Sequence, residues 1–352
     1  MMFAGRPITC ERCHGPGEAH AAQPLKTNIV NPVRLDVRRR DSVCEQCHLG
    51  GEARIPKAGR QAWDYRPGEL LEDTVAVFVS GSTKETKRQP MKVVSHFEQL
   101  AASKCAQASG GRLWCGSCHD PHAIPERPAA YFNGKCRQCH ASVHAGRRED
   151  CIGCHMKKRE TFDGGHTAFT DHRIVAKPGP IAITMDLPTT LRPWRESTGA
   201  AARRDLGLAY VSAGERDQSA WHLSEGFRHL AEVQDAFPRD PAVLTSLAAV
   251  LQHKRVPLEA AALFRRAAAL QPLDARHWLN LGIALLEAGE TSLAAEPLKT
   301  AIALDPFLRE AYILLAGARP EADPDGTRRK ILEEYLEIVP ESIVVRGMLR
   351  PR

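Results

Sequence analysis

The sequence lacks several features that would place it in a common class. No run of 18 apolar residues occurs among its 352 residues, so the sequence predicts no transmembrane helix. Aromatic residues make up only 6%, which is too few for an ordinary β-sandwich or β-barrel core. The formal net charge is +6, from 48 basic and 42 acidic residues, and so mild an excess does not indicate nucleic-acid binding. No cysteine follows Cys154.

Cysteine and histidine are instead concentrated in the first half of the chain. All 11 cysteines lie between Cys10 and Cys154, and 11 of the 15 histidines lie at or before His172. This asymmetry indicates two chemically different parts in a chain long enough for two or three domains. Ten of the cysteines form tight pairs with two residues between them, which is untypical of a disulfide framework.

Each pair belongs to a CxxCH motif, the attachment pattern of c-type haem. Two thiols at this spacing reach the two vinyl groups on one porphyrin edge, and the following histidine becomes the proximal iron ligand. The sequence therefore predicts five covalent c haems with their irons. The attachment residues are Cys10, Cys13, Cys44, Cys47, Cys115, Cys118, Cys136, Cys139, Cys151 and Cys154, and the proximal ligands are His14, His48, His119, His140 and His155.

Two other uses of paired cysteines compete with haem. CxxC units can combine into Cys₄ zinc sites, and a thioredoxin-like redox site also uses CxxC. Zinc does not explain why histidine follows all five pairs, and no βαβ pattern surrounds them. The unpaired Cys105 is interpreted as a small buried residue or an idle thiol.

Six further histidines are candidates for the distal axial positions of five irons: His20, His96, His122, His144, His166 and His172. His122 and His144 follow their own motifs too closely to cross to the far face of the same haem, so they are expected to serve a neighbouring haem. His96 lies in residues 93–101, an amphipathic stretch that predicts a helix packed on a porphyrin face.

Two segments resemble a known family. They are Cys10-Glu-Arg-Cys13-His14-Gly-Pro-Gly-Glu-Ala-His20 and Cys151-Ile-Gly-Cys154-His155-Met-Lys-Lys-Arg159, the latter followed by His166 and Asp171-His172-Arg173-Ile174. Residues 6–175 resemble the multihaem c-type cytochromes with doubled CxxCH motifs. That superfamily includes electron carriers of nitrification, cytochrome c nitrite reductase and hydroxylamine oxidoreductase. The resemblance implies that His20, His166 and His172 are distal ligands.

The start of the sequence departs from that family. Residues 1–6 lead almost directly into Cys10, without a charged segment followed by an apolar one. Haem is attached to CxxCH motifs outside the bacterial cytoplasm. We therefore expect a periplasmic or other extracytoplasmic protein whose N-terminal part, signal sequence included, is missing here.

The second half of the sequence follows a different period. Pro238, Pro272, Pro306 and Pro340 lie 34 residues apart, which is the period of tetratricopeptide (TPR) repeats. Two units match the repeat motif, through Leu244, Leu247, Ala248, Leu251, Ala260, Phe264, Ala267 and Pro272, and through Trp278, Leu281, Gly282, Leu285, Ala294, Leu298, Ala301 and Pro306. The sequence thus predicts about four helix pairs over 198–345, whose concave face would bind a protein or peptide.

The predicted fold is mostly α. A haem-packed cytochrome domain (1–175), with short helices and loops around touching haems, precedes a Pro-rich linker (176–197) and the TPR α-solenoid. The linker holds a short extended piece at 181–187. The propionates of five haems would be largely offset by the net charge of +6.

The predicted function is electron transfer, with redox proteins as partners, no nucleic acid and no catalytic residue. The alternative is a haem oxidoreductase acting on small nitrogen or sulfur compounds. Against it, no CxxCK motif occurs, and neither Tyr65 nor Tyr131 has the setting of a catalytic tyrosine. A third possibility is a repeat scaffold whose haems sense redox state.

Overall fold

The computed structural model describes residues 9–81, 91–140, 150–161, 163, 167–176, 190–318 and 326–349. The chain divides into two compact units, Met1–Ser197 (unit 1) and Thr198–Arg352 (unit 2), and each is described by itself. Within the described ranges, no helix has both the length and the apolar character needed to cross a bilayer.

A small antiparallel sheet lies at the core of unit 1. Its strand order is β1 (Ala53–Pro56), β2 (Val75–Ser80) and β5 (Leu191–Pro193). Every residue of the central strand β2 is buried, consistent with its run of β-branched and aromatic residues. The side chains packed against it are Leu49, Tyr65, Leu71 and Phe97. The sequence analysis did not predict this sheet, and β5 lies in the segment that it interpreted as a linker.

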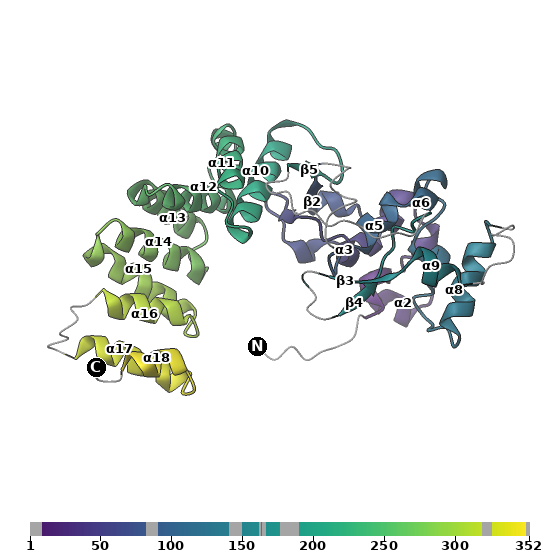
Figure 1. Ribbon diagram of the computed structural model, residues 1–352. Helices are drawn as coiled ribbons and strands as arrows, with labels where there is room; N and C mark the ends of the chain where they lie inside the picture. The colour runs from purple at the N-terminus through teal and green to yellow at the C-terminus, as the bar shows by residue number, and fades with distance from the viewer. Residues whose placement is uncertain are drawn as a thin grey trace. The chain divides into compact units, whose positions relative to one another are not determined.

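Short helices carry the rest of unit 1 (Figure 1). They are α1 (Glu11–His14), α2 (Glu18–Ala22), α3 (Val37–His48), α5 (His96–Ala102), α6 (Lys104–Ala108), α7 (Cys115–Cys118), α8 (Pro128–Arg137) and α9 (Cys151–His155), with 3₁₀ turns η1 (Pro32–Arg34), η2 (Ala62–Asp64) and η3 (Leu71–Asp73). A hairpin of β3 (Lys158–Glu160) and β4 (Ala168–Thr170) follows α9. The extended piece expected at 181–187 lies outside the described residues.

Unit 2 consists of successive antiparallel helix pairs, as the 34-residue period predicts (Figure 1). The pairs are α10 (Gly199–Arg216) with α11 (Ala220–Ala231), α12 (Pro241–His253) with α13 (Pro257–Leu270), α14 (Ala275–Glu287) with α15 (Thr291–Leu304), and α16 (Arg309–Gly317) with α17 (Thr327–Ile338). A last helix, α18 (Ile343–Met348), follows them, and η4 (Gln234–Ala236) follows α11. The predicted α-solenoid of four helix pairs is confirmed.

The small residues of the repeat motif are buried where two helices cross. A Cβ atom added to Gly282 of α14 would lie 2.6 Å from Cδ2 of Leu298 on α15, so only glycine allows this approach without a shift. Ala294, Leu298 and Ala301 are fully buried beside it. Pro272, Pro306 and Pro340 each follow a second helix closely, whereas Pro238 comes after η4, so the first pair departs from the predicted period.

Candidate haem centres

The five CxxCH motifs each coincide with a turn of helix in unit 1. The backbone N–H of His14 donates to the carbonyl of Cys10 over 2.9 Å, and His119 and His140 repeat this bond to Cys115 and Cys136 over 2.9 and 3.0 Å. The second motif forms the end of α3, and the fifth forms α9. A helical turn places residues three and four apart on one face, so the two thiols and the imidazole of a motif share a side of the backbone.

The motif thiols are accessible and unbridged. All ten are free, and each is exposed or only partly buried. Thiols of different motifs meet in two places. The Cys44 and Cys115 thiols share a hydrogen bond, which raises the pKa of Cys44 and lowers that of Cys115. The Cys136 thiol is hydrogen-bonded to that of Cys151, and burial raises its pKa. The second motif therefore lies beside the third, and the fourth beside the fifth.

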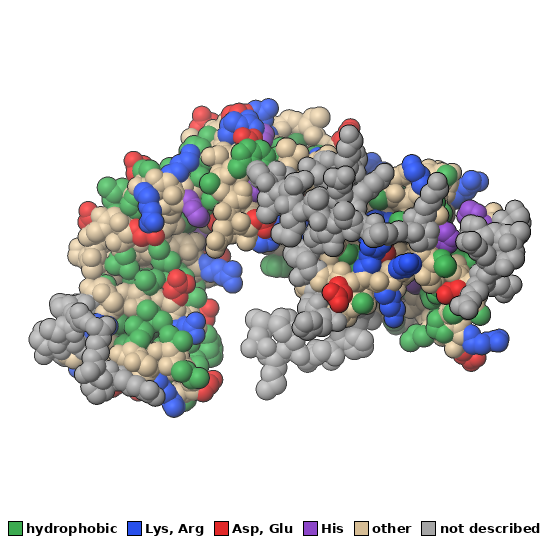
Figure 2. Space-filling view, in the orientation of Figure 1, with side chains coloured by type: hydrophobic (Ala, Val, Ile, Leu, Met, Phe, Trp, Pro, Cys, Tyr) green, Lys and Arg blue, Asp and Glu red, His purple; other side chains and the backbone are tan. Residues whose placement is uncertain are grey.

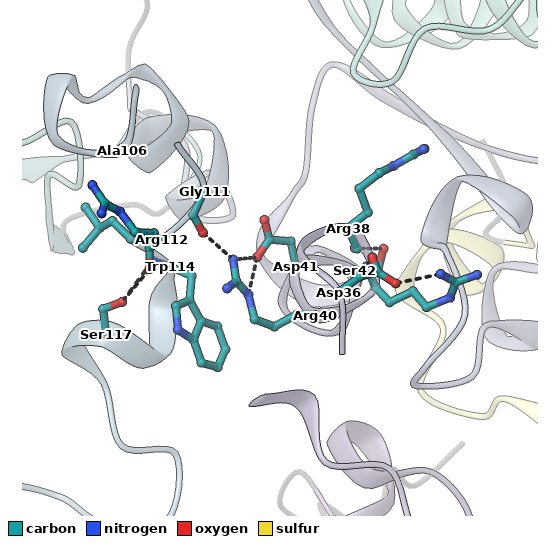
Figure 3. A network of polar contacts seen from close by, with 12 residues as sticks. Asp36, Arg38, Arg40, Asp41, Ser42, Ala106, Gly111, Arg112, Trp114 and Ser117 are labelled. Atoms are coloured by element: carbon teal, nitrogen blue, oxygen red, sulfur yellow. Dashed lines mark hydrogen bonds and ion pairs between the residues drawn. The ribbon is translucent and has the colours of Figure 1, made fainter. Parts of the chain in front are cut away.

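A polar network holds the second and third motifs together (Figure 3). Arg40 of α3 donates through Nη2 to Asp41 over 2.9 Å and to the carbonyl of Gly111 over 3.1 Å. Its guanidinium lies 4.7 Å from the ring centre of Trp114, the residue before Cys115. The network is partly buried, so a charge-assisted bond and a cation–π contact connect two segments 71 residues apart in sequence.

Three proximal histidines each face an imidazole that the sequence analysis selected as a distal ligand. The ring centroids are 5.8 Å apart for His14 and His122, 5.4 Å for His48 and His96, and 6.1 Å for His119 and His172. Two imidazoles on opposite sides of one metal have centroids about 6 Å apart, since each nitrogen lies about 2 Å from the metal. The spacing in all three pairs thus fits two axial ligands of one iron.

Several of these imidazoles are oriented by a carbonyl at Nδ1. The Nδ1 atoms of His14 and His155 donate to the carbonyls of Val30 and Val175 over 2.7 and 2.6 Å. Nδ1 of His172 donates to the carbonyl of Thr170 over 2.9 Å. A metal-binding histidine commonly donates one ring N–H in this way and presents the other nitrogen to the metal.

The imidazoles of His48, His96, His119 and His172 form one cluster. Those of His96 and His172 are 4.8 Å apart. Burial and the three neighbouring imidazoles lower the pKa of His96 to about 4, and burial also lowers the pKa of His119 and His172. These rings are therefore neutral near pH 7, and the neutral ring is the form that binds metals. Nδ1 of His96 is buried without a hydrogen-bond partner in the described part of the chain.

These observations fit haem for three of the five motifs. His140 is exposed and His20 donates from Nδ1 to the carbonyl of Leu25 over 3.1 Å, but neither joins an imidazole pair among the residues described. The candidates His144 and His166 lie outside the described residues. Among the described residues, no group of three or more His, Cys, Asp or Glu side chains is placed to hold one metal ion.

Sequence reasoning missed the residues that position the cluster. Gln99 is buried on α5, where its Oε1 accepts from the backbone N–H of His172 over 2.8 Å. Buried Glu45, inside the second motif, accepts from Trp194 Nε1 over 2.9 Å and from Arg195 over 2.7 Å. A lone Gln or Glu carries no motif, and the carbonyls that bond His14 and His155 have no side-chain signature.

The surface around the motifs carries histidine and positive charge. Figure 2 shows histidine side chains at the surface near α6 and α9, and Lys and Arg side chains beside the β3–β4 hairpin. Lys157 and Lys158 are exposed there. Such a surface is complementary to anionic groups such as haem propionates or an acidic protein.

Comparison with known proteins adds the repeat architecture only. Neither the scan against protein families nor the search of curated proteins found a match. Similar solved structures include MamA from Desulfovibrio magneticus RS-1 (22% identity, TM-score 0.37, covering 43% of this chain and 84% of that one). Another is a Thermobaculum terrenum O-GlcNAc transferase (24%, 0.35, 41% and 27%), of which the chain spans about a quarter. A third is the first TPR of Spaghetti bound to an HSP90 peptide (20%, 0.30, 35% and 92%). The helix pairs of unit 2 themselves identify the repeats.

Proposed function

We propose that unit 1 is a multihaem c-type cytochrome that transfers electrons, loaded with five haems outside the cytoplasm. The observation that carries the proposal is the pairing of His14, His48 and His119 with a second imidazole at 5.4–6.1 Å. A haem iron held by two imidazoles exchanges electrons without binding a substrate. This favours a carrier over the alternative of an oxidoreductase for small nitrogen or sulfur compounds, which needs an open iron.

The protein would hold and tune the haems through its own residues. The motif cysteines would attach each porphyrin, and the imidazoles would occupy both axial positions. Hydrogen bonds from Nδ1 to the Val30 and Val175 carbonyls would fix the rings of His14 and His155. The contacts between Cys44 and Cys115, and between Cys136 and Cys151, support haems close enough for electrons to pass from one to the next.

We further propose that unit 2 docks a redox partner protein. Its exposed apolar side chains include Leu273, at 83% of full exposure, and Phe307, at 69%. Neither belongs to the buried repeat core, so both are available to a second protein. TPR repeats present such side chains on a curved face that binds protein segments.

Intact-mass measurement of the matured protein tests the haem proposal first. The full chain is exported behind a signal peptide in cells that contain cytochrome c maturation enzymes. We expect a mass increase of five haems. A protein that gains only zinc, or no prosthetic group, would overturn the proposal.

Optical spectra then separate the carrier from the enzyme. We expect only low-spin bands, unchanged by nitrite, hydroxylamine or cyanide. A high-spin band that shifts with any of these ligands would show an open iron and overturn the simple carrier.

A further inference from the structure

We infer that His122, His96 and His172 are the distal ligands of the haems attached at Cys10/Cys13, Cys44/Cys47 and Cys115/Cys118, respectively. This inference rests on the proposed function and adds which imidazole serves which haem. It assigns three of the six candidate histidines and leaves His20, His144 and His166 for the two haems of the fourth and fifth motifs.

The assignment follows from distance. His14 has one described imidazole at ligand spacing, His122, although His122 is only three residues from the proximal ligand of another motif. His119 has His172 at 6.1 Å, and His48 has His96 at 5.4 Å. His96 and His172 lie only 4.8 Å apart, which is too close for two ligands on opposite sides of one iron. They therefore belong to different haems.

Local structure holds each distal ligand in place. The backbone N–H of His122 donates to Asp120 over 2.9 Å, which closes a tight turn directly after the third motif. His96 begins α5, and Gln99 on the same helix accepts from the backbone N–H of His172. One helix thus positions the distal ligands of the second and third haems, and their touching imidazoles make these two haems neighbours.

The ring planes distinguish the three haems. The planes of His14 and His122 are 19° apart and those of His119 and His172 are 29° apart, whereas His48 and His96 are nearly perpendicular at 88°. In ferric haems with two imidazole ligands, near-parallel planes give a rhombic electron paramagnetic resonance signal. Near-perpendicular planes give a signal dominated by a single large g value. Each assignment therefore has its own spectral signature.

The test uses His122→Gly, His96→Gly and His172→Gly in the matured full-length protein, with His253→Gly in unit 2 as the matched control. We expect each of the three variants to keep five attached haems and to convert one of the five to high spin, with low spin restored by added imidazole. His96→Gly should remove a large-g signal, and the other two should each remove a rhombic signal. The control should leave the spectrum unchanged.

Two outcomes would overturn the pairing. One is a variant with five attached haems that all stay low-spin, and the other is loss of a rhombic signal in His96→Gly. If a glycine variant does not mature, the corresponding methionine variant replaces it, and the expected result is one haem with a raised reduction potential. An unchanged set of potentials in that variant would then overturn the assignment. A wild-type protein without attached haem would instead contradict the proposed function, so the two failures are distinguishable.

Discussion

Replacing Leu298 by alanine should destabilise unit 2 by about 3–5 kcal/mol. The Leu298 side chain is fully buried under Gly282, in the middle of the repeat core. Removal of three carbon atoms costs about 2.4 kcal/mol in transfer free energy, and the cavity that remains adds the rest. The matched control is Leu293→Ala on the same helix, where the side chain is 55% exposed. We expect the control to cost less than about 1 kcal/mol.

The contact with Gly282 makes the reasoning sharper. Gly282→Ala alone should gain about 1 kcal/mol in helix propensity but lose about 1–3 kcal/mol, because its new methyl group would collide with Leu298. In the Leu298→Ala background the collision disappears and the methyl group fills part of the cavity. The double variant should therefore be more stable than Leu298→Ala by about 1 kcal/mol.

Urea unfolding of the full chain, followed by hydrogen exchange of peptides from α14 and α15, measures these differences. Exchange reports on the local unit, so transitions in unit 1 do not interfere. Additive effects of the two substitutions, or equal costs for Leu293→Ala and Leu298→Ala, would refute this account of the repeat packing.

Three further predictions concern single residues. Arg204, buried between Asp205 and Asp240, should cost about 3–5 kcal/mol when changed to Met, whereas exposed Arg203 should cost less than about 1 kcal/mol by the same urea assay; equal losses would contradict this. Burial lowers the pKa of His277, so the unfolded chain binds more protons below its own pKa of about 6.5. Unit 2 should therefore lose stability on acidification from about pH 7.5 to 5.5, and less so in His277→Gln; a variant with the full pH dependence would exclude His277 as a source. Cys105→Ser should leave the mass increase of five haems unchanged, because Cys105 lies outside the motifs on α6, and loss of a haem would show a role in attachment.

The repeat fold could be predicted from the sequence because its period repeats in side-chain size. α12, α14 and α16 begin at Pro241, Ala275 and Arg309, each 34 residues after the last, and residues such as Ala260 and Ala294 are fully buried at equivalent places. The sheet of unit 1 could not be predicted in the same way. Its strands are short, and β5 pairs with a strand more than 100 residues earlier, a contact that no local pattern encodes.

The haem motifs are local and could be read directly, whereas the axial pairs depend on tertiary structure. His122 faces His14, which is 108 residues away in sequence, and spacing alone indicated only that it serves another haem. The resemblance singled out His172 but not its partner. The haems themselves remain a prediction.

The late position of β5 has a consequence for the order of assembly. An exported chain emerges from its N-terminus, so all five CxxCH motifs, which end at His155, pass the membrane before Leu191–Pro193. Until then β2 has β1 on one side and an open edge on the other. Attachment enzymes would therefore meet the motifs while the sheet is incomplete and the cysteines are easy to reach. We expect the closing strand to act as a timer, which gives haem ligation its opportunity before the fold locks.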